Sequence, residues 1–267
     1  MKIRLCGDLI AHLVVEEENG GNGTLAMIRR GEKADACIVL EPSDRKLFTS
    51  IRGAVWFKII FKGKAGHSGA AGASKSALLM ARDAIGILEK YHANLLAESK
   101  GIPLFDAYEN PMPITFGSLQ AGNWPASTPS KAVLMGVLGF LPDKTYDEIC
   151  GEMYDALKNG LDQLARDNFE IEFMYRHNSS VINPEHSLPS AIKRAGEELQ
   201  KTILISAMTA SCDAWFYNNQ LKIPTVVFGP GSLKVAHSKM EQIAMGDIAE
   251  AAAILLDFII NYCGVSE

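Results

Sequence analysis

Between residues 53 and 177 the hydrophobic pattern places strands and helices in an order that few folds use. The pattern predicts a strand, a helix, two strands, a helix and a strand, over residues 55–61, 74–91, 113–119, 132–141, 146–165 and 169–175. This βαββαβ order is that of the ferredoxin-like split motif. We therefore expect residues 53–177 to form a complete domain that is inserted into a larger one.

The segments on either side of the insertion, residues 1–52 and 178–267, are predicted to form one discontinuous α/β domain. Short apolar strands alternate there with helices, over residues 9–15, 24–30, 36–40, 188–199, 224–228 and 247–262. We expect the strand over residues 9–15 to be buried. Acidic residues follow the first two strands, and functional sites in open α/β sheets gather at strand ends.

Composition and charge argue against several classes of protein. The formal net charge is −5 at pH 7, whereas nucleic-acid binders usually carry a basic face. No window approaches the roughly 20 apolar residues of a membrane span, and we expect no signal peptide. The five cysteines form no CxxC pair, which indicates reduced thiols and predicts a cytoplasmic protein.

The run Glu16-Glu17-Glu18, followed by a glycine-rich turn, is the first candidate for chemistry. Neighbouring side chains of an extended chain point to different sides, so adjacent carboxylates can do separate work. One can bind a metal while the other takes a proton from water. An isolated acidic run is more often a solvated turn. The apolar residues before this run and the glycines after it favour a site.

Three further candidates are ordinary when each is taken alone. Glu41 ends a predicted strand, His237 follows a Gly-Pro-Gly turn, and His67 lies in a glycine-rich loop. A histidine in a loop is more often structural or exposed than a ligand. Only the combination of these residues indicates a site.

Taken together, these segments resemble the co-catalytic zinc aminoacylase and carboxypeptidase family, which includes acetylornithine deacetylase, succinyl-diaminopimelate desuccinylase and glutamate carboxypeptidase. The matching motifs, in family order, are Val15-Glu16-Glu17-Glu18-Asn19-Gly20-Gly21, Leu40-Glu41-Pro42, Gly66-His67-Ser68, Ser211-Cys212-Asp213-Ala214, and Phe228-Gly229-Pro230-Gly231 with Ala236-His237-Ser238. They cover essentially the whole chain. The resemblance implies a partial zinc-peptidase-like α/β catalytic domain with an inserted ferredoxin-like lid and dimerisation domain.

The resemblance implies a metal site in the α/β domain. Glu17 is the expected general base, which activates the metal-bound water. Glu18 and His237 are expected to bind one zinc ion, and Glu41 is expected to bind the other. The family implies zinc as the cofactor, with cobalt as an alternative.

The resemblance also implies roles around the substrate. His67, on the lid, is expected to stabilise the developing oxyanion in the site of a partner subunit. Gly229 and Gly231 are expected near the substrate carboxylate, where glycine lets backbone N–H groups approach closely. Asn123 matches a polar substrate contact, and Asp213 matches a position of structural support. The implied assembly is a homodimer through the lid domain.

The sequence departs from the family in its first metal-binding motifs. It contains no His-x-Asp and no Asp-x-Lys-Gly, so we expect a chain that is truncated at its N-terminus relative to the family. Only Glu18, Glu41 and His237 remain as candidate ligands, whereas catalytic zinc usually has about three protein ligands plus water. Gly139 stands near the position where many relatives carry an arginine that holds the substrate carboxylate.

The missing strands are expected to leave apolar faces exposed. The affected segments are residues 9–15, 36–40 and 224–228. Exposed apolar patches of this kind are usually covered by a partner, or they aggregate.

Two functions are compatible with the sequence. The first is a metal-dependent hydrolase of amide bonds in small N-acyl amino acids or short peptides. The second is a non-catalytic remnant that acts as a dimerising or binding module. A nucleophile at Ser211 or Cys212 is disfavoured because no G-x-S-x-G elbow occurs. A solvated α/β domain with accidental acidic residues is the remaining alternative, and no nucleic-acid or membrane partner is expected.

Overall fold

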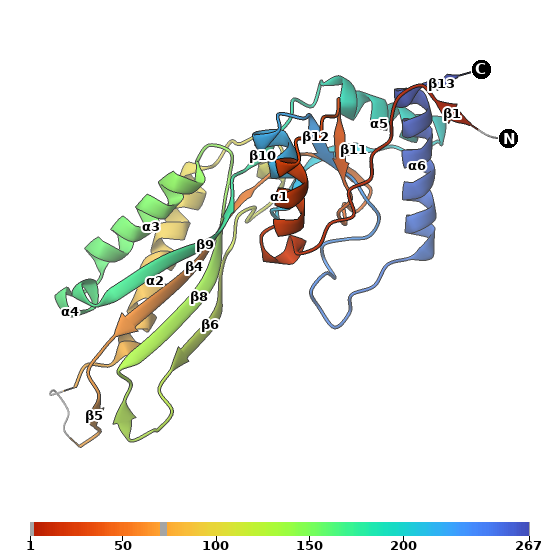
Figure 1. Ribbon diagram of the computed structural model, residues 1–267. Helices are drawn as coiled ribbons and strands as arrows, with labels where there is room; N and C mark the ends of the chain where they lie inside the picture. Colours follow the sequence, from red (N-terminus) through yellow and green to blue (C-terminus); the bar gives the residue numbers. More distant parts are fainter. Residues whose placement is uncertain (1–2, 70–73, 267) are drawn as a thin grey trace. The chain divides into compact units, whose positions relative to one another are not determined.

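The computed structural model describes residues 3–69 and 74–266. It divides into two compact units, of which the first joins Met1–Ile51 to Ser180–Glu267 and the second is Arg52–Ser179 (Figure 1). The sequence predicts the inserted domain over residues 53–177. Each unit has its own sheet and its own buried core.

The first unit alternates short strands with helices, as an α/β domain does. Its elements are β1 (Arg4–Leu5), η1 (Glu17–Asn19), α1 (Asn22–Arg29), β2 (Cys37–Val39), β3 (Lys46–Ile51), β10 (Ser180–Val181), α5 (Ser187–Glu198), β11 (Leu204–Met208), η3 (Phe216–Gln220), β12 (Thr225–Val227), α6 (Met245–Cys263) and β13 (Val265–Ser266). Strands β1 and β13 pair antiparallel and bring residues near the two ends of the chain together.

One sheet forms the centre of the first unit, with the strand order β10-β3-β12-β2 and with β11 paired to β3. Strand β12 runs parallel to β2, with Val227 opposite Val39, and β11 runs parallel to β3. Strand β12 also meets β3 at one antiparallel pair, Val227 and Phe48. The chain segments that follow β2 and β12 therefore leave the sheet at the same edge.

Both faces of this sheet are covered by side chains and helices. Leu47 and Val226 belong to a cluster with residues of α5 and α6. The next residue along each strand, Phe48 or Val227, belongs to a second cluster, because successive strand residues face opposite sides. Burial on both faces removes the apolar–polar alternation, which explains why the sequence pattern does not predict β3.

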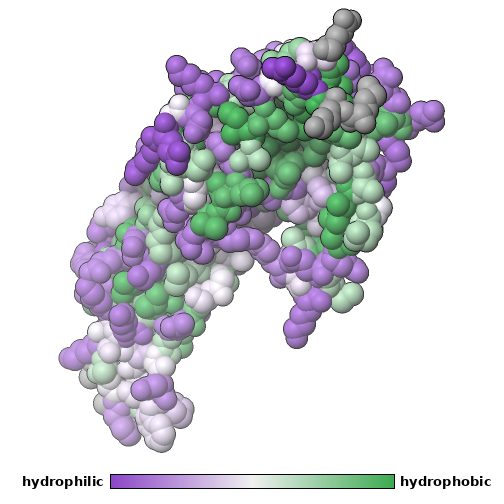
Figure 2. All heavy atoms as spheres, turned by 45° about the vertical axis from the view of Figure 1, so that its right-hand side comes forward, coloured by the Kyte–Doolittle hydropathy of each residue, from purple (hydrophilic) through white to green (hydrophobic). Residues whose placement is uncertain are grey.

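The segment Leu9–Val15 is not the buried strand that the sequence predicts. None of the described strands pairs with it, and Leu13 and Val15 are 96% and 72% exposed. Broad apolar areas of the first unit are visible in Figure 2. An apolar run is buried only where another surface covers it, and here only His12 and Val14 are half-buried, while the other five residues are exposed.

The expected exposure of residues 224–228 is wrong. Val226 and Val227 are fully buried and Phe228 is 1% exposed. Their strand, β12, has a neighbouring strand on each side, β3 and β2. Side chains from both faces of the sheet therefore cover it without further strands.

The second unit contains one four-stranded antiparallel sheet with the order β6-β8-β4-β9. Its elements are β4 (Gly53–Lys62), β5 (Gly66–His67), α2 (Ala77–Glu98), η2 (Phe105–Ala107), β6 (Ile114–Ala121), β7 (Ser127–Thr128), β8 (Lys131–Phe140), α3 (Tyr146–Gly160), α4 (Gln163–Asp167) and β9 (Phe169–His177). Helices α2 and α3 lie along this sheet in Figure 1.

Alternation along β4 separates the two faces of this sheet. Phe57, Ile59 and Phe61 are fully buried, whereas Lys58 and Lys62 point away and pair with glutamates of β9. Buried residues of α2 and α3 complete the core. The strand predicted over residues 55–61 is therefore present within β4, and its burial follows the period of two that a strand gives.

The helix that the sequence predicts over residues 146–165 is two helices. Thr145 and Glu148 form a capping box that starts α3. The helix ends at Gly160, and Asp162 then caps α4 by accepting a hydrogen bond from the Ala165 N–H at 2.8 Å. The apolar pattern continues across the break, so the pattern alone does not reveal it. The break is marked only by the capping side chain of Asp162.

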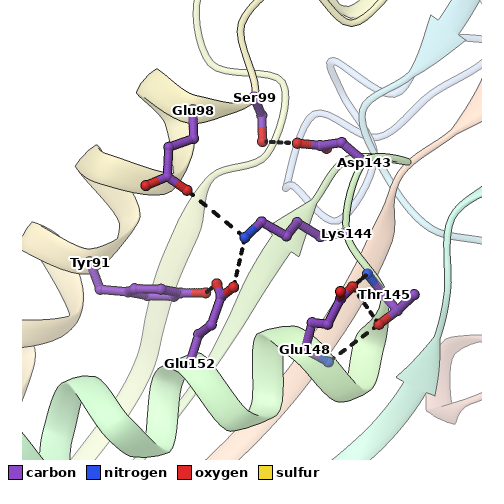
Figure 3. A network of polar contacts seen from close by, with 8 residues as sticks. All are labelled: Tyr91, Glu98, Ser99, Asp143, Lys144, Thr145, Glu148 and Glu152. Atoms are coloured by element: carbon purple, nitrogen blue, oxygen red, sulfur yellow. Dashed lines mark hydrogen bonds and ion pairs between the residues drawn. The ribbon is translucent and has the colours of Figure 1, made fainter.

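Polar contacts hold the last turns of α2 to α3 and the loop before it (Figure 3). Lys144 Nζ lies 2.6 Å from Glu152 Oε1 and 3.9 Å from Glu98 Oε2. Tyr91 Oη donates to Glu152 Oε2 at 2.8 Å. Glu152 thus accepts from two elements, which fixes the spacing of the helices at this end of the unit.

The structure bears on membrane spans and on the state of the cysteines. None of the described helices is long and apolar enough to cross a membrane. All five cysteines are free thiols.

We expect Gly136→Ala to destabilise the protein, because a Cβ at residue 136 would lie 2.4 Å from the Thr115 carbonyl oxygen and 2.5 Å from the Phe57 ring. Overpacking of this kind costs about 1 to 3 kcal/mol. The matched control is Gly86→Ala in α2, where a Cβ meets nothing within 4 Å. The control should gain about 0.5 to 1 kcal/mol. Urea unfolding measures both, and equal effects would contradict the packing of β4 against β8.

Candidate active site

Glu41 and the glycine turn Gly229–Gly231 meet at one edge of the first unit's sheet. Glu41 follows the last residue of β2, Val39, by two positions, and the turn begins two positions after Val227 of β12. Val39 and Val227 are opposite one another in parallel strands. The predicted gathering of site residues at strand ends is therefore present for this pair of segments.

The glycine turn lies against the backbone of Glu41. A Cβ at Gly229 would lie 2.6 Å from the Glu41 carbonyl oxygen, so the approach requires glycine. Ser43 Oγ donates to the Gly229 carbonyl at 2.9 Å, and the Asp44 N–H donates to the Gly231 carbonyl at 2.8 Å. The backbone that carries the Glu41 carboxyl is thus held in place by the turn.

Glu17 and Glu18 lie in η1, a single turn that leads into α1. Glu16 and Gly21 on either side adopt left-handed backbone, with φ of 65° and 69°, and the Gly21 N–H donates to the Glu16 carbonyl at 2.9 Å. Left-handed backbone costs a non-glycine residue about 1 to 2 kcal/mol. The turn leaves Glu17 partly buried and Glu18 exposed, so the two carboxyls have different surroundings.

His237 reaches Glu18 from a distant part of the chain. Its Nε2 lies 3.0 Å from Glu18 Oε1, although 219 positions separate the two residues. The His237 backbone is left-handed, with φ of 58°, and its N–H donates to Glu241 Oε2 at 2.7 Å. The two side chains are 74% and 69% exposed. An ion pair this exposed contributes at most about 1 kcal/mol, which does not by itself account for the strained backbone.

Burial and like charges raise the pKa values of two site carboxyls. Desolvation, followed by the charges of Asp213 and Glu18, raises the pKa of Glu17 to about 7, and His237 partly opposes this. Desolvation and the charges of Glu17, Asp213 and Glu18 raise the pKa of Glu41 to about 8. The carboxyls are therefore close enough to repel one another. A cation among them would relieve that repulsion.

These residues match a zinc site in donor chemistry but fall short in number. Two ligand atoms on one tetrahedral zinc ion lie roughly 3.3 Å apart, and carboxylate oxygen and imidazole nitrogen are both zinc ligands. The 3.0 Å between Glu18 Oε1 and His237 Nε2 is close to that separation. Within residues 3–69 and 74–266, no group of three or more His, Cys, Asp or Glu side chains is arranged to hold a metal ion. Glu18 and His237 thus form a two-donor pair.

The sequence does not predict the contacts beneath the acidic turn. Thr24 Oγ1 donates to Asp213 Oδ2 at 2.5 Å, and His12 Nδ1 lies 2.9 Å from Tyr217 Oη. Asp213 is expected from the sequence only as structural support, and it is 3% exposed. No local pattern marks Thr24 or Tyr217, since the paired residues are 189 and 205 positions apart.

The sequence matches Peptidase family M20/M25/M40 over residues 2–261. The chain belongs to this family. It is 27% identical to the N-formyl-4-amino-5-aminomethyl-2-methylpyrimidine deformylase of Bacillus subtilis (strain 168), over 98% of this chain and 66% of that protein. It is 23% identical to the acetylornithine deacetylase of Myxococcus xanthus, over 98% of this chain and 67% of that protein. The chain thus spans about two thirds of the length of these relatives, and the family expected from the motifs is confirmed.

Solved structures, one of them of an M20 family member, have a similar fold. The di-peptidase Dug1p from Saccharomyces cerevisiae matches with a TM-score of 0.74 and 15% identity, over 93% of this chain and 64% of that one. The M20 family metallo-carboxypeptidase Sso-CP2 from Sulfolobus solfataricus matches with a TM-score of 0.71 and 14% identity, over 91% of this chain and 68% of that one. The predicted α/β class is confirmed.

Two of the residues that the M20 resemblance implicates, His67 and Asn123, belong to the second unit. His67 ends β5, and its Nδ1 accepts a hydrogen bond from the Gly69 N–H at 3.0 Å. It lines a cavity of about 410 Å³ together with Lys75, and Asn123 lines another of about 340 Å³. Both residues are exposed, so each offers a polar side chain at the surface of its unit.

Gly139, where many relatives have an arginine nearby, is adjacent to an arginine from another strand end. A Cβ at Gly139 would lie 2.6 Å from Arg52 Nη1. Arg52 is 9% exposed, and its Nη1 donates to the Gly53 carbonyl at 3.0 Å. The second unit therefore holds a buried guanidinium beside this position, although the sequence pattern shows only a glycine there.

The structure argues against a thiol nucleophile. Cys212 is 1% exposed, and burial raises the pKa of its thiol well above the usual value. A nucleophilic cysteine needs an accessible thiolate. A nucleophile at Cys212 is therefore disfavoured by the structure as well as by the sequence.

We expect Glu41→Gln to stabilise the metal-free chain at alkaline pH. The pKa of Glu41 is about 8 in the folded chain against an ordinary 4.5. The folded state keeps a proton that the unfolded state releases, so stability falls as the pH rises from about 4.5 to about 8. Glutamine removes this dependence. The difference in free energy of unfolding between Glu41→Gln and wild type, measured in EDTA, should therefore increase by roughly 1 to 3 kcal/mol from pH 5 to pH 8.

The control for this measurement is Glu198→Gln, which replaces an exposed carboxyl at the end of α5. It should show no such rise. If Glu41→Gln and wild type differ in free energy of unfolding by the same amount at pH 5 and at pH 8, the proposed crowding of carboxyls at the site is contradicted.

Proposed function

We propose that this chain carries the general base and part of the metal site of a zinc-dependent hydrolase, which cleaves amide bonds in N-acyl amino acids or short peptides. The observation that supports this most is the 3.0 Å contact between Glu18 and His237, next to a partly buried Glu17. Glu18 and His237 are both of a type that binds zinc, they come from distant parts of the chain, and Glu17 beside them has a carboxyl that can accept a proton. Membership of Peptidase family M20/M25/M40 supports the same reaction class.

Each residue has a separate part in the proposed reaction. Glu18 and His237 would hold one zinc ion, and Glu41 would belong to a second metal position. Bound zinc supplies Lewis acidity for the amide carbonyl and lowers the pKa of water to about 7. Glu17 accepts the proton of the attacking water and delivers it to the leaving nitrogen. No serine or cysteine nucleophile is needed.

The proposed substrates are small and carry a carboxylate. Relatives are named as a deformylase, a deacetylase and a di-peptidase. In this chain the turn lies beside Glu41; a side chain at Gly229 would clash there, and the Gly229 N–H donates to Ser43 Oγ at 3.3 Å. We propose that this turn receives the substrate carboxylate, that Asn123 contacts the substrate, and that His67 stabilises the oxyanion.

The two-donor pair requires further ligands. Catalytic zinc usually has about three protein ligands and one water. The described residues supply Glu18 and His237 at contact distance and leave Glu41 outside that pair. We therefore propose that residues outside these 267 complete the ligand set.

A binding module without catalysis is the second candidate function. The absence of any group of three or more metal-binding side chains within the described residues favours it. In that case Glu18 and His237 would remain as a surface ion pair. The function would then be dimerisation or binding through the second unit.

We expect the wild-type chain to bind zinc in calorimetry, and both His237→Ala and Glu18→Gln to weaken binding at least tenfold. Each substitution removes one of two donors. The matched control is His186→Asn, which replaces a half-buried histidine of the same unit and keeps an N-cap acceptor for α5. Loss of zinc binding in the control as well would contradict the assigned pair, and a wild type that binds no zinc would favour the binding module.

With zinc present, the chain should hydrolyse N-acetyl amino acids at least tenfold more slowly than an intact family member assayed alongside it. Zinc-dependent turnover within tenfold of that enzyme, and lost in Glu17→Gln, would show that the ligand set is already complete.

We further propose that the second unit forms a homodimer through β6. Strands β6 and β9 are the edges of its sheet. Strand β9 carries Glu170, Glu172 and Arg176, whereas β6 carries no charged residue. Charges on an edge strand oppose pairing with another chain, and an uncharged edge permits it. Two copies joined at β6 would form one continuous sheet.

Thr115→Lys should convert this dimer to a monomer, because it places a charge on the β6 edge. Met174→Lys on the opposite edge strand is the matched control and should leave the dimer intact. Light scattering during size-exclusion chromatography measures both. A wild type that stays monomeric at high concentration would contradict the proposal.

A further inference from the structure

Two contacts tie the chain around the acidic turn, residues 16–18, to the region where η3 begins. Before the turn, His12 Nδ1 lies 2.9 Å from Tyr217 Oη. After the turn, Thr24 Oγ1 donates to Asp213 Oδ2 at 2.5 Å. The contacts therefore bracket Glu17 and Glu18 in the sequence and end within five residues of one another on the other side.

The region that receives these contacts is firmly packed. Trp215, Phe216 and Tyr217 are buried in one cluster with Ile28 of α1. Asp213 is 3% exposed, and its carbonyl accepts a hydrogen bond from the Phe216 N–H at 3.0 Å. Both anchor points thus belong to a largely buried segment.

Without these two contacts, backbone strain and repulsion between carboxyls would favour a different position of the acidic turn. Glu16 holds a left-handed backbone that a non-glycine residue disfavours. The carboxyls of Glu17 and Glu41 lie close enough to one another and to Asp213 to repel when they are ionised. Repulsion among them favours an arrangement in which the turn lies further out.

Direct contact adds to the second anchor. A Cβ at Gly21 would lie 2.2 Å from Asp213 Oδ1, so the backbone of the turn rests on this carboxyl. Asp213 therefore meets the chain after Glu18 at two places: it accepts a hydrogen bond from the Thr24 hydroxyl, and its Oδ1 lies close to the backbone of Gly21. Residue 21 has to be glycine both for this approach and for its φ of 69°.

We propose that the contacts of Tyr217 with His12 and of Asp213 with Thr24 form a two-point clamp, which holds the acidic turn where Glu18 can meet His237. Tyr217 and Asp213 are positioning residues that act through the turn. The clamp serves the proposed metal site and in that respect rests on the proposed function. Its effect on the turn itself does not require a metal ion.

Thr24→Val removes the hydroxyl that donates to Asp213 while nearly keeping the volume of the side chain. Thr24→Ser keeps a hydroxyl donor at this position and should behave like wild type. The matched control is Thr225→Val, because Thr225 is also buried and its hydroxyl donates to the Ile223 carbonyl at 2.7 Å, away from the turn. Tyr217→Phe removes the hydroxyl that contacts His12 and also interacts with Thr24, and it keeps the aromatic ring in its cluster.

Two readouts separate positioning from general stability. The first is amide hydrogen exchange at Gly21 and Gly23, whose N–H groups donate to Glu16 and Val15 and close the turn. The second is zinc affinity by calorimetry. We expect Thr24→Val and Tyr217→Phe each to speed exchange at these amides at least tenfold and to weaken zinc binding at least fivefold. Thr24→Ser and Thr225→Val should stay within twofold of wild type in both.

The outcomes distinguish the clamp from the proposed function. If the wild type binds no zinc, the metal site fails, and exchange at the turn still decides whether the clamp exists. If zinc binds but Thr24→Val and Thr225→Val behave alike in both readouts, the clamp is overturned. Faster exchange with unchanged zinc affinity would overturn its role in positioning Glu18.

Discussion

The parallel pairing of β2 with β12 determines where a site can form in the first unit. It aligns Val39 with Val227, so the chain beyond each strand emerges at one edge of the sheet. Glu41 and the Gly229–Gly231 turn are neighbours for this reason, and Ser43 then bonds to the turn. A shift of this register would separate them, and no local interaction of the loops would bring them back together.

Charge at this edge is the second constraint on the unit. Several carboxyls share partly buried surroundings, and the rise in the pKa values of Glu17 and Glu41 expresses the cost of ionising them there. His237 offsets part of this for Glu17. A divalent cation would offset more of it, because it adds two positive charges where the repulsion arises. The electrostatics of the chain and its membership of the M20 family thus support the same kind of site.

The strands of the second unit could be predicted because their burial alternates along the chain, as in β4. The first unit was harder for two opposite reasons. Strand β3 is buried on both faces and shows no alternation, whereas Leu9–Val15 is apolar and yet exposed. Glu17, Glu18, Glu41 and His237 could be proposed from motifs. The Thr24–Asp213 bond could not, because it depends on three-dimensional neighbours that are far apart in the sequence.

The course of the chain through the first unit also orders the events of folding. The second unit is contiguous, so its sheet can form once residue 177 has been synthesised. Strand β2 has to wait for β12, which lies beyond the whole insertion. Pairing over such a sequence separation is slow, because a long loop must close first. During synthesis, therefore, the edge that carries Glu41 is among the last parts of the molecule to take shape, with its carboxyls solvated until then.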